Sequence, residues 1–85
     1  MAHYQVILAK NARRDLVKLD RITRGRATKV LLLLAEDPLR GVVKLRGKDE
    51  TLLRARAGSY RIVFRVVSNT VEILRIAHRK DIYKR

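Results

Sequence analysis

Cysteine is absent from this chain of 85 residues. Its absence excludes a disulfide scaffold, an iron–sulfur site, a thiolate nucleophile and the usual structural zinc site. Only His3 and His78 remain as imidazole ligands, and two histidines are too few for a metal cluster. We therefore expect a protein that uses neither a metal ion nor another cofactor.

Long apolar runs are missing as well. The longest one extends from Val30 to Ala35, far short of the roughly 20 residues that a membrane-spanning helix requires. The opening residues 1–4 are not followed by the charged, apolar and small-residue regions of a signal peptide. We therefore expect one cytoplasmic domain over residues 1–85, because a chain of this length has no room for a second domain.

Negative charge is scarce. Eight Asp and Glu residues stand against 21 Lys and Arg residues, which gives a net charge of +13. Such a field attracts polyanions, and the candidate partners are nucleic acid, a ribosome, an acidic protein and an anionic membrane. The short apolar runs make the membrane the least favoured of these. Arginine outnumbers lysine by fourteen to seven, and its planar guanidinium group favours paired hydrogen bonds to phosphate.

The spacing of apolar residues predicts a strand followed by two helices. Residues 4–8 have the pattern of a strand, and Asn11 is predicted to cap a helix that begins at Ala12. The helical pattern pauses at Asp20 and ends at Asp37-Pro38, because the residue before proline avoids helical backbone angles. The residues expected to face the core are Ala12, Leu16 and Leu19 on the first helix, and Thr23, Ala27, Val30, Leu31 and Leu34 on the second, where Leu32, Leu33 and Ala35 widen the buried stripe to more than one side.

The second half of the chain has the pattern of strands joined by tight turns. A short strand is expected over residues 42–45, and longer alternating strands over 52–57, 60–67 and 71–77. Turns are predicted at Gly58-Ser59 and Ser68-Asn69. The expected fold is α+β in the order β-α-α-β-β-β, with two N-terminal helices packed on one face of a small antiparallel sheet.

Arginines gather on the predicted outer face of this sheet. If Gly58-Ser59 forms a two-residue loop, the apolar positions of the flanking strands face one another on the core side. The same register places Arg56 directly opposite Arg61, with Arg54 and Arg65 on the same side. Like charges in such positions are destabilising, typically by a few tenths to about 1 kcal/mol. An anion that lies on this face would explain them.

A plainer interpretation is the ordinary solvated face of a half-covered sheet. It fits poorly with the scarcity of carboxylates, since only Glu72 is predicted to lie opposite one of the arginines, Arg65. The last strand adds a conflict, because strict alternation places Arg75 on the core side. Either the strand bulges near residue 75, or Arg75 extends outward at the sheet margin. A slip of one residue decides whether His78 or Arg79 points toward the arginines.

Four segments together carry a resemblance to a known family. They are Asp37-Pro38-Leu39, Lys44-Leu45-Arg46-Gly47, Gly58-Ser59-Tyr60-Arg61-Ile62-Val63-Phe64 and His78-Arg79-Lys80-Asp81-Ile82-Tyr83. In these segments, and over essentially its whole length, the chain resembles the RelE/ParE superfamily of bacterial and archaeal toxins. The C-terminal segment favours the RelE branch, whose members are ribosome-dependent endonucleases that cut messenger RNA in the ribosomal A site. Members of the ParE branch share the fold but poison DNA gyrase.

The resemblance implies a role for each of five residues. Arg61 matches the arginine that contacts the scissile phosphate, and Arg79 matches the arginine after the last strand. Arg54 stands where the family often has a lysine. Tyr83 matches a tyrosine that stacks on RNA and helps to move protons, and His78 stands where many relatives have histidine.

The chemistry of RNA cleavage agrees with these roles. Without a metal, the neighbouring 2′-hydroxyl is the nucleophile, and the site must accept one proton, donate another and stabilise charge at phosphorus. Arg54, Arg61 and Arg79 would supply the charge. Histidine is the side-chain type whose ordinary pKa lies closest to neutral, so His78 is the best candidate for moving protons. The other candidates are Tyr83, Tyr60 and a lysine such as Lys80. The alternatives are a strand-end histidine bonded to backbone and a tyrosine that anchors the tail on the core.

One departure from the family pattern leaves the general base open. Leu52 stands where a second basic residue is expected two positions before Arg54. The residues expected to bind RNA or ribosomal phosphates are Lys44, Arg46, Lys48, Arg56, Arg65 and Lys80, together with Arg13 and Arg14 on the first helix. The resemblance also implies a RelB-like antitoxin as partner, and an acidic antitoxin would suit the charge of +13. A gyrase inhibitor of the ParE type and a non-catalytic RNA-binding module remain as alternatives.

Overall fold

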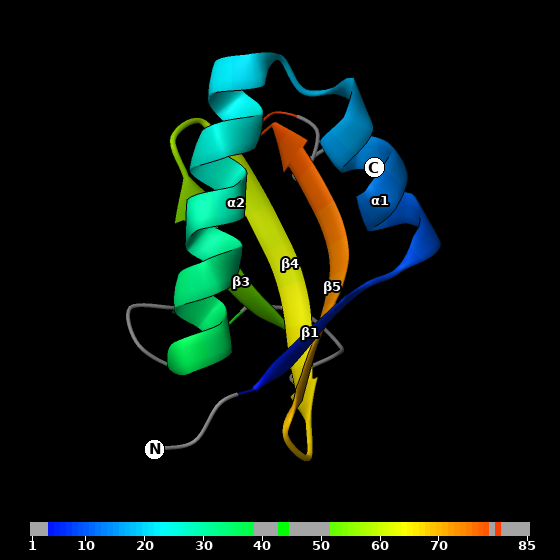
Figure 1. Ribbon diagram of the computed structural model, residues 1–85, viewed down its shortest axis with the longest axis vertical. Helices are drawn as coiled ribbons and strands as arrows, with labels where there is room; N and C mark the ends of the chain where they lie inside the picture. Colours follow the sequence, from blue (N-terminus) through cyan, green and yellow to red (C-terminus); the bar gives the residue numbers. More distant parts are fainter. Residues whose placement is uncertain (1–3, 39–42, 45–51, 79, 81–85) are drawn as a thin grey trace.

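A five-stranded sheet carries two helices on one face (Figure 1). The computed structural model describes residues 4–38, 43–44, 52–78 and 80. The elements in chain order are β1 (Gln5–Leu8), α1 (Lys10–Lys18), α2 (Arg21–Glu36), β2 (Val43–Lys44), β3 (Leu53–Ala57), β4 (Tyr60–Val67) and β5 (Thr70–His78). The strands lie in the order β1-β5-β4-β3-β2.

The expectation of two helices on a mostly antiparallel sheet is confirmed. One feature of the sheet differs from it, because the strand β1 pairs with β5 in parallel. The short strand expected over residues 42–45 is present as the two-residue strand β2, which continues the sheet beyond β3. The alternation of side chains has the same period in parallel and antiparallel strands, so the sequence pattern did not reveal the direction of the β1–β5 pair.

The start of α1 is set by a backbone contact. The N–H of Ala9 donates to the carbonyl oxygen of Ile73 at 2.8 Å, which ties the chain to β5 as it leaves β1. The helix therefore begins at Lys10, with Ala9 as an N-cap that offers no side-chain acceptor. The prediction that Asn11 caps a helix beginning at Ala12 is wrong, because this tertiary hydrogen bond fixes the boundary two residues earlier.

The start of α2 follows the sequence pattern. The Asp20 side chain accepts from the backbone N–H groups of Ile22 at 3.2 Å and Thr23 at 3.3 Å. Hydrogen bonds from Thr23 are the main cause of a pKa for the Asp20 carboxyl below its usual range. Arg24 of α2 also donates from Nη2 to the carbonyl oxygen of Leu19 at 2.8 Å, so a side chain of α2 caps the C-terminal end of α1.

The core lies between the helices and the covered face of the sheet. Phe64, Ile62 and Ile73 are fully buried at its centre, and truncating a phenylalanine in such a place typically costs about 3–5 kcal/mol. The predicted inner stripe of α2 packs into this core. The expected widening of that stripe is wrong, because the side chains of Leu32 and Leu33 are each 63% exposed. The described elements contact α2 along one side only, so consecutive leucines cannot all be covered.

The β3–β4 hairpin has the predicted register. Gly58 has a φ of 65°, a conformation that glycine adopts without steric cost, and a two-residue turn places Ala57 opposite Tyr60. Arg56 then lies directly opposite Arg61, as the sequence predicts. This register places the arginines of both strands on the face that the helices do not cover.

Candidate functional site

The uncovered face of β3 and β4 carries a set of arginines that we call the arginine face. Its members are Arg54, Arg56, Arg61 and Arg65. Alternation along each strand and the paired register between the strands bring them to one side. The structure therefore assembles the four arginines that the sequence placed together.

Arg61 differs from the other members of this face in its burial. Only 9% of the residue is exposed, and its flanking neighbours Val63, on the same strand, and Ala77, opposite on β5, are each 8% exposed. The Nη1 atom of Arg61 is buried and has no hydrogen-bond partner among the residues that the structure describes. Leaving a buried polar atom unpaired typically costs about 1–3 kcal/mol, and more for a charged group. The Arg61 guanidinium group therefore has an unused hydrogen-bond donor on this face.

Arg65 and Arg56 have different surroundings. The Nε of Arg65 donates to the Glu72 carboxylate at 2.6 Å, and both side chains are partly exposed. This is the pair that the turn at Ser68-Asn69 predicts. Arg56 is exposed and lies directly opposite Arg61. The strand register therefore brings two like charges together, which is unfavourable.

The last strand contains the bulge that the sequence offered as one alternative. Along β4 the partner on β5 changes from Ile73, opposite Phe64, to Arg75, opposite Val63. Leu74 is thus an extra residue without an opposite partner. Strict alternation fails beyond residue 73 for this reason, and Arg75 reaches the margin, where its Nε donates to Asp15 of α1 at 2.8 Å.

The bulge decides which side of the sheet each later residue of β5 faces. Ile76 is buried in the core, and Ala77 lies opposite Arg61. His78 lies opposite Tyr60, and the two rings meet edge to face with centroids 5.4 Å apart. Because Tyr60 packs against the core, His78 is directed to the helix side and away from the side of Arg61.

The remaining polar contact of His78 is with backbone. Its Nδ1 accepts from the N–H of Lys80 at 3.2 Å. The structure therefore has the strand-end histidine bonded to backbone, together with an aromatic neighbour. Among the other predicted site residues, Lys80 is exposed and Lys44 belongs to β2. The predictions for Arg46, Lys48, Arg79 and Tyr83 lie outside the described residues.

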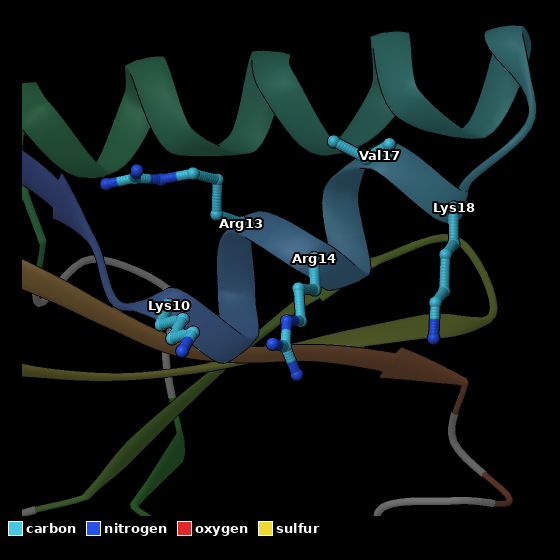
Figure 2. Close-up of a pocket in the computed structure, with 5 residues that line it drawn as sticks. All are labelled: Lys10, Arg13, Arg14, Val17 and Lys18. Atoms are coloured by element: carbon cyan, nitrogen blue, oxygen red, sulfur yellow. The ribbon is translucent and has the colours of Figure 1, made fainter.

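A second basic surface lies on α1. Figure 2 shows the residues that line an open hollow of about 330 Å³ along this helix: Lys10, Arg13, Arg14, Val17 and Lys18. Sequence reasoning named Arg13 and Arg14 but missed Lys10 and Lys18. Their spacing of three and four residues, opposite the buried Ala12, would have placed all four cations on one helix face.

The described ranges contain neither a metal-binding cluster nor a membrane-spanning helix. Residues 4–38, 43–44, 52–78 and 80 contain no group of three or more His, Cys, Asp or Glu that could hold a metal ion. No helix among them is long and apolar enough to cross a membrane.

Comparison with known proteins places this architecture in a family. The family model for the ParE toxin of the type II toxin–antitoxin system, parDE, matches residues 6–83. The chain belongs to the RelE/ParE family of type II toxins. This RelE/ParE toxin is also 40% identical to Toxin RelG of Mycobacterium tuberculosis over 85 residues, which cover 96% of the chain and 98% of that relative.

Solved structures of toxin–antitoxin complexes have the same fold as this RelE/ParE toxin. In the RelBE2 complex of Mycobacterium tuberculosis, the matching chain has a TM-score of 0.83 and 34% identity, with 92% of this chain and 100% of that chain covered. The archaeal RelE–RelB complex of Pyrococcus horikoshii gives a TM-score of 0.77 and 27% identity, with 91% and 96% covered. The fold and family expected from the sequence are therefore confirmed.

Proposed function

We propose that this RelE/ParE toxin is a ribosome-dependent endoribonuclease that cuts messenger RNA in the A site and so stops translation. One observation carries the proposal: within the described part of the chain, the buried Nη1 of Arg61 has no hydrogen-bond partner, and it lies on a face that holds three more arginines. A buried, unpaired guanidinium nitrogen destabilises the free protein. It gains its hydrogen bond when an oxyanion such as a phosphate oxygen lies against it.

The same geometry supports a mechanism without a metal. The 2′-hydroxyl attacks the adjacent phosphorus, the bond to the 5′-oxygen breaks, and the products are a cyclic phosphate and a free 5′-hydroxyl. Arg61, with Arg54 on the same face opposite Val63 and Arg79 after the strand, would stabilise the charge that develops on the phosphorane oxygens. Tyr83 is proposed to stack on a base and to move protons.

His78 is proposed to contribute from the end of β5. His78 lies opposite Tyr60, so its ring points to the helix side of the sheet and away from Arg61. To transfer a proton at a phosphate bound to Arg61, the ring would have to reach around the end of β5. We therefore propose that His78 acts chiefly in structure, by packing against Tyr60 and accepting the hydrogen bond from the backbone N–H of Lys80. The principal proton mover that we propose is then Tyr83, which follows β5 in the chain.

The proposed partners follow from charge and from the relatives. A RelB-like antitoxin is proposed, because the solved relatives are toxin–antitoxin complexes and because an acidic partner suits a charge of +13. The ribosome and its message are the proposed targets, which implies action in the cytoplasm. Exposed cations on the arginine face and on α1, such as Arg56 and Arg14, are available to ribosomal phosphates.

The test is primer extension on a message that is being translated in a cell-free system, with Arg61→Ala as the variant. We expect the wild-type protein to produce cuts positioned by the reading frame. Arg61→Ala should reduce cutting by about 100- to 1,000-fold, as for loss of one preorganised donor. Its melting temperature is measured in parallel, because loss of an unsatisfied buried charge and loss of the packed aliphatic stem change stability in opposite directions.

A matched control separates this effect from loss of charge alone. Lys29→Ala removes one cation from the exposed surface of α2 and should cut at nearly the wild-type rate. Equal cutting by Arg61→Ala and wild type would contradict the assignment of Arg61. Intact messages together with inhibited DNA supercoiling would instead support a gyrase inhibitor. We retain this alternative because the matching family model is described as the ParE toxin.

A further inference from the structure

A carboxylate of α1 reaches the edge of β5 at the bulge. The Oδ2 atom of Asp15 accepts from the backbone N–H of Ile76 at 2.9 Å and from the Nε of Arg75 at 2.8 Å. The other oxygen, Oδ1, lies 3.4 Å from the Nη2 of Arg75. The Asp15 side chain is only 15% exposed, so these are its contacts in a mostly water-excluded position.

The Ile76 amide needs this acceptor because no strand lies beside it. The strand β1 pairs with β5 only from Thr70 to Ile73, and Ala9 then turns the chain into α1. Beyond Ile73 this edge of β5 lacks a strand partner among the described elements. An amide left unpaired next to the buried Ile76 side chain would be costly, and Asp15 removes that cost.

The bulge that Asp15 holds decides what lies beside Arg61. With the bulge, Ala77 lies opposite Arg61 and His78 lies opposite Tyr60. Without the extra residue Leu74, the pairing would shift by one position and place Ile76 opposite Arg61, with His78 on the same side of the sheet. An isoleucine in place of a small alanine would crowd the guanidinium group of Arg61.

We propose that Asp15 is a positioning residue of the arginine face. It fixes the register of β5 through the Ile76 amide and thereby keeps the surroundings of Arg61 open to a phosphate. This inference rests on the proposed function where it concerns cleavage, but the register itself is independent of any activity. Asp15 touches no residue of the arginine face directly and acts only through β5.

Two contacts of Asp15 can be separated by substitution. The Arg75 side chain is 52% exposed, and an ion pair of such exposure contributes little. The Ile76 amide is the contact that needs an acceptor. Asp15→Asn keeps a side-chain oxygen for that amide but loses the charge, whereas Arg75→Gln loses the ion pair and keeps the carboxylate. Asp15→Ala loses both contacts.

The experiment measures register by NMR and cleavage by primer extension in the same four proteins. In Asp15→Ala we expect the Ile76 amide to exchange with solvent at least roughly tenfold faster, as for loss of one hydrogen bond that is part-buried. The cross-strand proton contacts between Tyr60 and His78 should weaken, and cutting should fall about tenfold. Asp15→Asn and Arg75→Gln should stay within about threefold of wild type in both measurements.

Three results would overturn the proposal. The first is an Asp15→Ala protein with wild-type exchange at Ile76 and intact Tyr60–His78 contacts. The second is an Arg75→Gln protein as impaired as Asp15→Ala, which would assign the effect to the ion pair. The third is an Asp15→Asn protein that has lost Ile76 protection, and this arm decides the matter even if Asp15→Ala does not fold. Absence of cutting by wild type would refute the proposed function alone, because the NMR arms do not depend on it.

Discussion

Arg61 and Arg65 lie on the same strand and the same face, yet their surroundings differ. Arg65 is exposed and is paired with Glu72 at 2.6 Å, so it needs nothing further. Arg61 is buried and leaves its Nη1 unpaired. A residue held in an unfavourable environment by the rest of the fold is typical of a functional position. We therefore base the account on Arg61 rather than on the number of arginines.

The sequence predicted some of these residue-level facts and missed others. The opposition of Arg56 to Arg61 and of Arg65 to Glu72 followed from the two-residue turns, because such turns fix the register of a hairpin. The burial of Arg61 did not follow from any local pattern. It depends on packing over the uncovered face, which alternation along one strand does not describe.

At this scale His78 provides a test. In His78→Gln we expect cutting to fall by less than about tenfold, because the ring lies on the side of Tyr60 and loss of a general acid or base typically costs 10²- to 10⁴-fold. Single-turnover cutting in cell-free translation, measured from about pH 5.5 to 8.5, checks this. A loss of 100-fold or more, together with disappearance of an inflection near neutral pH, would show that His78 moves a proton in the reaction.

At the scale of elements, the helices and hairpins depend on different kinds of signal. Asp20 and Asp37-Pro38 mark the ends of α2 by local chemistry, and both boundaries were predicted within two residues. The start of α1 depends on the Ala9–Ile73 hydrogen bond, which joins residues far apart in the chain. The conflict at Arg75 did point to the bulge, because an arginine cannot occupy a core position.

The cap of α2 makes a prediction about acid stability. The pKa of Asp20 is lowered in the folded protein, mainly by hydrogen bonds from Thr23, so the ionised carboxylate stabilises the fold. This contribution is complete above the unfolded-state value of about 3.9 and is lost as the pH falls through the lower folded value. Asp20→Ala should therefore melt at a lower temperature than wild type at pH 7.

The measurement is a pair of thermal melts, one at pH 7 and one at about pH 2, with circular dichroism as the probe. The difference between Asp20→Ala and wild type should shrink at the lower pH, because a larger fraction of the wild-type carboxyl is then protonated. Asp20→Asn is the control, since asparagine caps helices without titrating and should show a small difference at both pH values. A difference that is the same at both pH values would show that the cap does not act through its charge.

At the scale of the whole molecule, the cations that give the net charge of +13 gather in particular places. One part lies on the arginine face, and another lines the hollow on α1, where Figure 2 shows Arg14 and Lys18 extending from the helix. The first turn of α1 contains no acidic residue. Lys10 and Arg13 near the N-terminus of the helix oppose the helix dipole, whereas Lys18 in its last turn complements it, so the placement of the first two does not favour stability. Contact with a polyanion would offset that cost.

The α1 surface therefore predicts a particular salt dependence. Arg14→Gln should weaken binding to ribosomes and reduce the slope of log affinity against log salt concentration by about 1, as for loss of one phosphate contact. Lys29→Gln removes the same charge from α2 and should leave the slope nearly unchanged. Sedimentation with purified ribosomes at several salt concentrations gives both values. Equal slopes for wild type and Arg14→Gln would mean that this helix does not contact RNA phosphate.

The central claim is that the unpaired Nη1 of Arg61 receives a phosphate of the message. The most direct measurement is a structure of this protein on a ribosome whose A-site codon carries 2′-O-methyl groups, which prevent the cut. The account predicts a backbone phosphate oxygen at about 3 Å from Nη1, with the RNA strand across the arginine face. A message bound elsewhere, with Nη1 still buried and unpaired, would contradict it.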